Sequence, residues 1–236
     1  MNFNKARILS GSMLKLIACT AMLLDHCGAF IPWDAIGIGG TLFILKGKAI
    51  SISVILRLIG RTAFPLFAFL ITEGFTHTRD KRKYGMNMLV FAFISEIPWN
   101  LIHSGELTYP SQNAFFTLSL GVYGLYFLDR FKDERTKQCI SLLALLVLSF
   151  LLHADYGAFG YGFIILLYLL RDRKLFMTII GCCTLPSRWI GGLAFIPICM
   201  YNGKRGFIHS KVVKYAFYIF YPAHLLILYY VCAALH

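Results

Sequence analysis

An aspartate and a histidine stand next to each other in an apolar stretch near the start of the chain, at Asp25 and His26. A neutral imidazole accepts a proton at neutral pH, which is general-base chemistry, and it can also act as a nucleophile. Because adjacent helical residues point in different directions, Asp25 is not expected to hydrogen-bond His26 directly. It is expected to pair with an arginine of another helix or to tune His26 through the local field. We predict that His26 and Asp25 are the catalytic residues.

Six further charged or titratable side chains stand within apolar stretches. They comprise two pairs spaced i, i+4, each of which lies on one face of a helix, and two single residues. A charged side chain in the middle of a membrane costs about 2.5–3.5 kcal/mol, so such groups usually face a cavity or one another. We expect anions and cations to pair across helices, either in a functional site or in ion pairs that only fix helix packing. The six are Arg57 with Arg61, Glu73 with His77, Glu96, and His224.

A proline stands two to four residues from one of these groups in each of three apolar stretches, at Pro65, Pro98 and Pro222. A proline inside a membrane helix frees a carbonyl group that a neighbour or water must satisfy. A shared, water-accessible cavity between the first, second, third and last helices would explain all three prolines together. A simple packing kink at each proline is the alternative.

The composition indicates which kind of fold must position these groups. Of the 236 residues, 58% are hydrophobic, 16% aromatic and 14% charged, and the mean hydropathy is +0.68. Soluble domains carry roughly 25% charged residues, and a domain of this length still exposes roughly a quarter to a third of its surface. A soluble domain, a disordered chain, a collagen-like repeat and a disulfide scaffold are therefore excluded. The sequence predicts an all-α, polytopic membrane bundle that forms a single domain over residues 1–236.

The formal net charge of +12 reflects membrane topology rather than nucleic-acid binding. Most of the 23 Lys and Arg residues lie in short clusters beside apolar stretches, and basic loops of this kind stay on the cytoplasmic side. The seven cysteines form no Cys-x-x-Cys pair and no metal-ligand spacing, so they are expected to be buried thiols and no metal site is predicted. The basic clusters lie at 5–15, 79–83, 130–137, 171–174 and 204–214.

Apolar stretches near the roughly 20 residues needed to span about 30 Å are the candidate membrane helices. The stretch at 175–201 is broken by Pro186 and by two glycines, and is either one kinked pass or two short passes forming a hairpin. Keeping every basic cluster inside requires two passes there, which gives about nine helices (range eight to ten) and a cytoplasmic N-terminus. The first stretch lacks a small-residue cleavage site, so we expect an uncleaved helix. A Gly-rich stretch at 34–47 is expected to be interfacial. The helices are expected at about 13–33, 51–74, 85–103, 113–129, 138–153, 157–171, 175–201 and 212–234.

Short motifs spread along the chain resemble one protein family. The most specific is the stretch 57–70, RLIGRTAFPLFAFL, which continues to Glu73-Gly74 and His77-Thr78. Together the motifs resemble the TraX family of membrane proteins, and the similarity runs over about residues 13–228. The other motifs are 14–18 leading to Met22 and Asp25-His26, then 95–98, Asn113 before 115–117, 155–157, and 221–225.

The resemblance implies an activity. The type member of the TraX family is implicated in N-terminal acetylation of conjugative pilin, and the family is similar to a wider group of transmembrane acyltransferases that use acetyl-CoA. That group has a basic residue eleven positions before an essential histidine, and Lys15 and His26 match this spacing. The resemblance therefore implies that His26 is catalytic, that Asp25 is its companion and that acetyl-CoA is the donor. The predicted acyl-CoA and substrate-binding residues are Lys15, Arg57, Arg61, Glu73, His77, Glu96, Asn113 and His224.

We therefore expect an acyltransferase in the inner or plasma membrane. It would move an acetyl group from cytoplasmic acetyl-CoA to an amine or hydroxyl at the outer side, either directly or through an acetyl-histidine. A pilin-like peptide and a sugar both fit as the acceptor. The CoA phosphates are expected near Lys15 and the basic cluster at 79–83, and Arg57 or Arg61 is expected to stabilise the thioester oxyanion.

Two other classes of protein fit part of the pattern. Charged helices with proline breaks also describe the pathway of a proton-coupled transporter, although no inverted repeat of hydropathy is evident. A non-catalytic assembly factor would use the same intramembrane charges only as packing pairs. No metal cofactor and no nucleic-acid partner are expected for any of the three.

Overall fold

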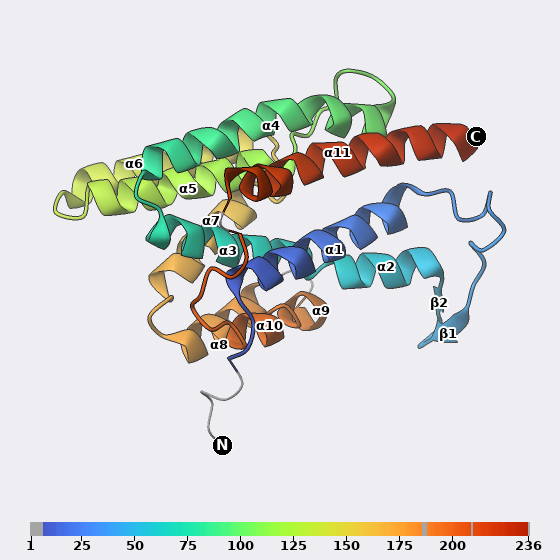
Figure 1. Cartoon of the computed structure of the whole chain (residues 1–236), viewed down its shortest axis with the longest axis horizontal. Coiled ribbons are helices and arrows are strands. Elements are labelled where there is room, and N and C mark those ends of the chain that lie inside the picture. The colour runs from blue at the N-terminus through green and yellow to red at the C-terminus, as the bar shows by residue number, and fades with distance from the viewer. Residues whose placement is uncertain (1–6, 186–187, 209, 236) are drawn as a thin grey trace.

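The computed structural model describes residues 7–185, 188–208 and 210–235 and is predominantly helical (Figure 1). A single short β-hairpin is added to the helices in this part of the chain. The all-α prediction is therefore confirmed. The helices are α1 (Gly11–Phe30), α2 (Ile52–Gly60), α3 (Ala63–His77), α4 (Lys81–Ser104), α5 (Ala114–Arg130), α6 (Arg135–Leu151), α7 (Gly157–Leu169), α8 (Lys174–Thr184), α9 (Arg188–Gly192), α10 (Phe195–Cys199) and α11 (Lys211–Leu235).

Four helical stretches are long and apolar enough to cross a membrane, as judged over the described residues. They are α1, the combined α2–α3 stretch, α4 and α11, and they identify a membrane protein. Three further apolar helices, at Gly157–Leu169, Lys174–Thr184 and Ile190–Cys199, are shorter. The expected number of nine membrane helices is therefore not confirmed by helix length.

The stretch expected to form a single second helix is divided in two at Arg61 and Thr62. The cause lies four residues further on, because Pro65 has no N–H to donate to the carbonyl of Arg61 and its ring collides with that carbonyl in a regular helix. The Arg57–Arg61 pair and the Glu73–His77 pair consequently belong to different helices, α2 and α3. By contrast, α4 runs on through Pro98 and α11 through Pro222.

The region at 174–199 folds back on itself. Helix α8 packs against α9 and α10, and Gly181 of α8 lies so close to the Phe195 ring that a Cβ at this glycine would overlap it. Pro186 and the following serine lie outside the described residues. The described residues thus form three short helices here rather than one kinked helix.

The Gly-rich connection between α1 and α2 contains the hairpin, with β1 (Phe43–Leu45) antiparallel to β2 (Lys48–Ile50). Lys46 and Gly47 both have positive φ, 50° and 77°, as a two-residue primed hairpin turn requires. The strands are largely exposed, so this connection lies outside the helical bundle at the far right of Figure 1.

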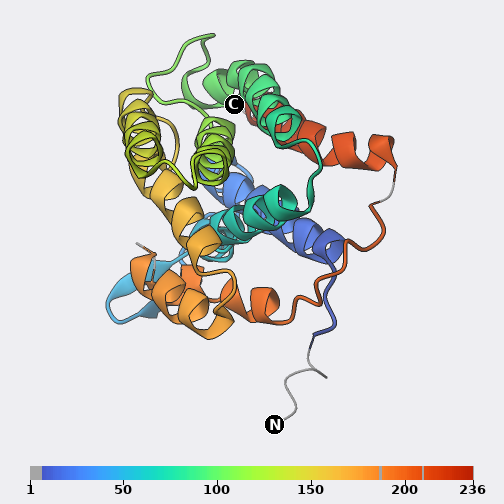
Figure 2. The same cartoon turned by 90° about the vertical axis from the view of Figure 1, so that its left-hand side faces the viewer.

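Helix α3 lies at the centre of the bundle, which Figure 2 shows along the long axis. Most of its residues are buried, and it packs against α1, α5 and α7. Helix α1 lies beside α2 on one side and α11 on the other, and α11 also lies along α4. The α3–α4 and α5–α6 connections lie at one end of the molecule, at the left in Figure 1, whereas the C-terminal ends of α1, α4 and α11 meet at the other. This second end contains Asp25 and His26, near the C-terminal end of α1.

Candidate functional site

His26 of α1 and His224 of α11 form a direct hydrogen bond, with 2.6 Å between His26 Nδ1 and His224 Nε2. Their ring centroids are 4.9 Å apart and the ring planes differ by 15°. The second nitrogen of His224, Nδ1, lies 2.7 Å from the carbonyl oxygen of Phe220. Both nitrogens of His224 thus have partners, whereas Nε2 of His26 has no hydrogen-bond partner among the described residues. The structure brings together two site residues that are 198 positions apart in the chain.

Aromatic and titratable side chains from α4 and α11 complete the surroundings of His26. The Tyr221 ring lies 6.1 Å and the Phe30 ring 6.0 Å from the imidazole, centroid to centroid. His103, near the end of α4, packs edge-on against Phe30 at 4.9 Å, and its Nδ1 donates to the Trp99 carbonyl at 2.8 Å. His26 therefore lies where α1, α4 and α11 come together.

Asp25 faces away from His26 and toward α2, as the spacing on α1 predicts. Its Oδ2 lies 3.4 Å from the guanidinium of Arg57, whereas Oδ1 is buried and has no hydrogen-bond partner in the described chain. Arg61, one turn further along α2, forms no ion pair with a carboxylate of the described residues. Of the two arginines that the sequence offered as partners, Arg57 is the one that pairs with Asp25.

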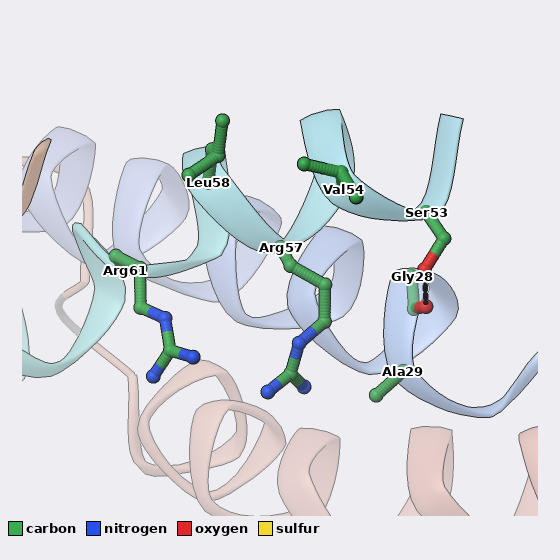
Figure 3. Close-up of a pocket in the computed structure, with 7 residues that line it drawn as sticks. All are labelled: Gly28, Ala29, Ser53, Val54, Arg57, Leu58 and Arg61. Atoms are coloured by element: carbon green, nitrogen blue, oxygen red, sulfur yellow. Dashed lines mark hydrogen bonds between the residues drawn. The ribbon is translucent and has the colours of Figure 1, made fainter. Parts of the chain in front are cut away.

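An open cavity of about 490 Å³ lies between the end of α1 and the face of α2 that carries both arginines. Figure 3 shows the side chains of Arg57 and Arg61 extending from α2 in the same direction, with Ser53 hydrogen-bonded to the carbonyl of Gly28 at 2.6 Å. The residues that line this cavity come from α1, α2 and the turn that follows α2. The lining residues are Gly28, Ala29, Ser53, Val54, Arg57, Leu58 and Arg61.

Asp155 extends the charged group from the connection between α6 and α7. Burial, and to a lesser degree the nearby Asp25 carboxylate, raise the pKa of its carboxyl to about 6, against the opposing effects of the Tyr156 backbone N–H and of the Arg61 and Arg57 guanidinium groups. Its Oδ1 accepts from the backbone N–H of Tyr156, a residue in the left-handed conformation (φ 63°). Two acids, Asp25 and Asp155, and two arginines, Arg57 and Arg61, therefore lie within electrostatic reach of one another.

Glu96 pairs with Asn113 and not with a cation, which corrects the expectation of an ion pair. The Asn113 side-chain amide lies 2.5 Å from Glu96 Oε2 and 2.8 Å from the carbonyl of Ala92, and its oxygen accepts from the backbone N–H of Phe115. Asn113 is fully buried and begins α5 as its N-terminal cap. These two predicted site residues join α4 to α5, so their role in the structure is to connect helices.

Glu73 and His77 lie at the opposite end of α3 from Arg61, about 18 Å along the helix axis. His77 is mostly exposed, and its Nδ1 lies 2.9 Å from the carbonyl of Glu73. Glu73 lies beside Tyr201, and burial together with this acid raises the pKa of the tyrosine. The structure therefore does not bring this pair to His26. It places the pair at the opposite end of the bundle, which we call the basic end because Lys15, Lys83, Arg205 and Lys214 lie there.

Lys15 also lies at the basic end, where it faces other cations. Arg205 and Lys214 lie within electrostatic reach of Lys15, and Lys83 and Arg205 do so for Lys214. None of the four forms an ion pair within the residues that the structure describes. By contrast, Lys81 of the same cluster as Lys83 is already paired, 2.5 Å from Asp129. We call the four cations without an ion pair in the described residues the basic cluster; they are Lys15, Lys83, Arg205 and Lys214.

The connection before α11 is fastened to the start of α1, which fixes the basic cluster. The backbone N–H groups of Gly11 and Ser12 donate to the carbonyls of Lys204 and Arg205 at 2.8 and 2.9 Å. The Ser12 hydroxyl also donates to the Arg205 carbonyl at 2.7 Å. Gly206, at φ 82°, is packed so tightly against Ser10 and Ser12 that a side chain here would collide with them. Lys15 and Arg205 are therefore held near each other by backbone structure.

Sequence reasoning missed His103 and Asp155 as members of the site. His103 follows Glu96 by seven residues, which is two helical turns on the same face, and this spacing was a usable signal. Asp155 stands in a motif that contributed to the family resemblance, but no periodic pattern connects a residue in a helix connection to a helix face. The described chain contains no group of three or more His, Cys, Asp or Glu residues arranged to hold a metal ion.

Comparison with known proteins bears on what this arrangement does. The family model described as "TraX protein" matches residues 10–232. A curated protein of Dichelobacter nodosus, named "Probable fimbrial assembly protein FimC, serogroup H1", is 28% identical over 249 residues, which cover 93% of this chain and 94% of the relative. No solved structure matches the chain.

Proposed function

The chain belongs to the TraX family, and from this premise we propose that it is a membrane-embedded acetyltransferase. It transfers an acetyl group from acetyl-CoA to an amine or hydroxyl acceptor, with His26 as the catalytic residue. The observation that carries the proposal is the geometry of His26, whose Nδ1 is hydrogen-bonded to His224 while its Nε2 is left without a partner. An imidazole arranged in this way accepts a proton from an attacking nucleophile.

The chemistry assigned to His26 is balanced over one transfer. The acceptor nitrogen or oxygen forms a bond to the acyl carbon as its proton passes to His26 Nε2. The C–S bond then breaks, and the same proton passes to the departing CoA sulfur. Alternatively, Nε2 attacks the acyl carbon itself and passes the acetyl group on in a second step. Arg57, close to both Asp25 and His26, or its neighbour Arg61 stabilises the negative charge on the thioester oxygen.

The basic cluster is the proposed binding site for the phosphates of the donor. Lys15 precedes His26 by eleven residues, about 16 Å along α1, so a donor bound at the cluster must reach the imidazole through an extended arm. CoA has this form, with phosphates at one end and the thioester at the other end of the pantetheine arm. Four unpaired cations supply the positive potential that such a polyanion needs.

Orientation and location follow from the same proposal. Because basic connections are retained on the cytoplasmic side, the proposal has the N-terminus and the basic cluster on that side of the inner or plasma membrane, where acetyl-CoA is made. His26 then lies toward the outer side, where the acceptor enters. Reporter fusions at Asp80 and Ser104, at opposite ends of α4, are expected to report opposite sides of the membrane. Two fusions on the same side would contradict this topology.

The acceptor is proposed from the relative's name. A homologue over nearly the whole chain is called a probable fimbrial assembly protein, so a pilin-like subunit with an N-terminal amine is the first acceptor to test, and a sugar hydroxyl is the second. An assembly factor without catalysis would also suit that name. A proton-coupled transporter would use the Asp25–Arg57 and Asp155 charges as its pathway.

Labelled acetyl-CoA separates the three functions. Purified protein in lipid nanodiscs is expected to bind acetyl-CoA and to hydrolyse it slowly when no acceptor is present. Transfer of label to a pilin-like peptide or to an oligosaccharide identifies the acceptor. Protein that neither binds nor hydrolyses acetyl-CoA would contradict the acetyltransferase, and proton uptake in proteoliposomes would then favour the transporter.

A further inference from the structure

We propose that His224 is the positioning residue for His26, holding it in the tautomer that carries its proton on Nδ1 and directs a bare Nε2 lone pair at the acceptor. The inference rests on the proposed function only for the identity of the reaction. The tautomer itself follows from hydrogen-bond geometry and is measurable without turnover.

A backbone carbonyl can only accept hydrogen bonds, so any ring nitrogen bonded to one must be the donor. Because the Phe220 carbonyl oxygen lies 2.7 Å from His224 Nδ1, this nitrogen carries a proton. In a neutral imidazole the second nitrogen, Nε2, is then an acceptor. His26 Nδ1, 2.6 Å away, must therefore be the donor in the bond between the two rings. The remaining nitrogen of His26, Nε2, is left with an unprotonated lone pair.

The mutual orientation of the rings supports a true hydrogen bond rather than stacking. Rings that lie face to face have no pair of atoms as close as 2.6 Å when their centroids are 4.9 Å apart and their planes nearly parallel. His26 and His224 therefore meet edge to edge and almost coplanar. In this orientation the Nδ1–H of His26 points along the in-plane lone pair of His224 Nε2.

His224 is itself held in one orientation, which a positioning residue requires. It is 5% exposed, and the Phe220 ring lies 4.9 Å from it at 21° while the Tyr221 ring lies 5.7 Å from it, edge-on. The Phe220 carbonyl is one turn earlier on the same helix, so the Nδ1 bond resists rotation of the ring. Because His224 Nε2 also bonds His26 Nδ1, the fixed orientation of His224 in turn fixes that of His26.

The pair also has a place for the proton once His26 has accepted one. Protonation of His26 at Nε2 makes both of its nitrogens donors, and the Nδ1 proton can then move across the short bond to His224 Nε2. His224 would carry the positive charge with both N–H groups bonded, to Phe220 and to His26. The return of that proton restores the starting tautomers, so no proton is gained or lost over the cycle.

Other groups facing His26 do not provide the same constraint. His103 donates its own Nδ1–H to the Trp99 carbonyl, and the Arg57 guanidinium is paired with Asp25. Tyr221 contacts the imidazole through its ring, with centroids 6.1 Å apart. Within the described residues, His224 is the side chain that forms a hydrogen bond with His26.

The test uses full-length protein in nanodiscs and three substitutions. His224→Phe keeps an aromatic ring but removes the acceptor, whereas His224→Gln offers an amide oxygen that can accept from His26 Nδ1. His153→Asn, in an exposed connection with positive φ that asparagine tolerates, is the histidine control. Nitrogen-15 NMR of histidine-labelled protein, assigned with His26→Ala, reports which ring nitrogen of His26 carries the proton.

In the unsubstituted protein, we expect His26 to be protonated on Nδ1 and bare on Nε2, and His224→Phe to give a mixture of tautomers. The same substitution should lower kcat by about 10²-fold or more with little change in KM for acetyl-CoA, as loss of correctly directed base catalysis predicts. His224→Gln should restore the tautomer and bring kcat to within about tenfold. Protonation of His26 on Nε2 in the unsubstituted protein would overturn the inference, as would an unchanged tautomer in folded His224→Phe. A protein without acetyl transfer but with the expected tautomers would refute the proposed function and leave the role of His224 standing.

Discussion

Gly60 of α2 lies directly against the side chain of Asp25 on α1, so closely that a Cβ at this glycine would overlap the carboxylate. The contact presses the carboxylate into the interface between the two helices, where Oδ1 has no hydrogen-bond partner and Oδ2 faces Arg57. The glycine therefore lets α2 approach α1 and sets the position of the acid next to His26.

Gly60→Ala is expected to displace Asp25 and to impair transfer, although the substitution removes no titratable group. Overpacking at a close contact costs about 1–3 kcal/mol, so we also expect a lower melting temperature. Gly162→Ala is the matched control, because a Cβ at Gly162 meets no atom within 4 Å and alanine is the better helix former. Equal activity and stability in both variants would contradict the close packing of Gly60 on Asp25.

A second prediction concerns the effect of breaking the Asp25–Arg57 ion pair on the rate of transfer. Asp25→Asn should slow transfer by orders of magnitude, within the 10²–10⁴-fold range of general-base contributions. Arg57→Gln leaves the carboxylate without its ion-pair partner, so it should also be slow. The double variant should lose far less than the product of the single losses, because both substitutions break the same interaction. Steady-state rates for the four proteins give this comparison, and fully multiplicative losses would show that the two residues act independently.

The sequence was sufficient for the class of fold and for the residues with chemistry, because both depend on local patterns. Long apolar stretches predict membrane helices, and a charged group inside one is conspicuous whatever surrounds it. The break at Arg61 depends on where the clash of Pro65 is relieved, and α4 and α11 absorb their prolines without a break. Which helix ends converge is a property of tertiary packing, so the contact between His26 and His224 was not predictable from spacing.

The same limit explains Glu96 and Asn113. Both were correctly singled out as unusual, yet their partner is each other, because Asn113 caps α5 while reaching back to α4. A sequence motif can single out a residue, but it does not identify the side chain that this residue contacts. Asp155 escaped prediction for the opposite reason, since a single acid in a connection is the least conspicuous of signals until the structure places it beside two arginines.

Asp155 predicts a pH dependence of stability. Burial raises its pKa from 3.8 to about 6, so between these values the folded protein holds a proton that the unfolded chain has released. The free energy of unfolding should therefore fall as the pH rises from about 4 to about 6, and should receive no further change from this group at higher pH. Thermal unfolding of the unsubstituted protein and Asp155→Asn across this range isolates the contribution. A difference between the two that stays constant from pH 4 to pH 6.5 would contradict the shift.

The basic cluster predicts a salt-dependent donor affinity. Lys83→Gln combined with Lys214→Gln should weaken acetyl-CoA binding about tenfold at low ionic strength, equivalent to about 1.4 kcal/mol, and should flatten its salt dependence. Lys174→Gln, at the start of α8 and outside the cluster, is the matched control. Titrations at low and high salt measure both effects. If the double variant and the control bind acetyl-CoA equally at low salt, the cluster acts in topology alone.

The proposed role of His26 in the transfer is measured directly by the acetylation that folded His26→Ala protein carries out when it is supplied with labelled acetyl-CoA. The variant is expected to insert, to fold and to bind acetyl-CoA with near-normal affinity, because the basic cluster that we propose to bind the phosphates lies at the other end of α1. Its rate of acetyl transfer should fall to background, and label trapped on His26 of the unsubstituted protein would identify the two-step route. A folded His26→Ala protein that transfers acetyl groups at the normal rate would contradict the account.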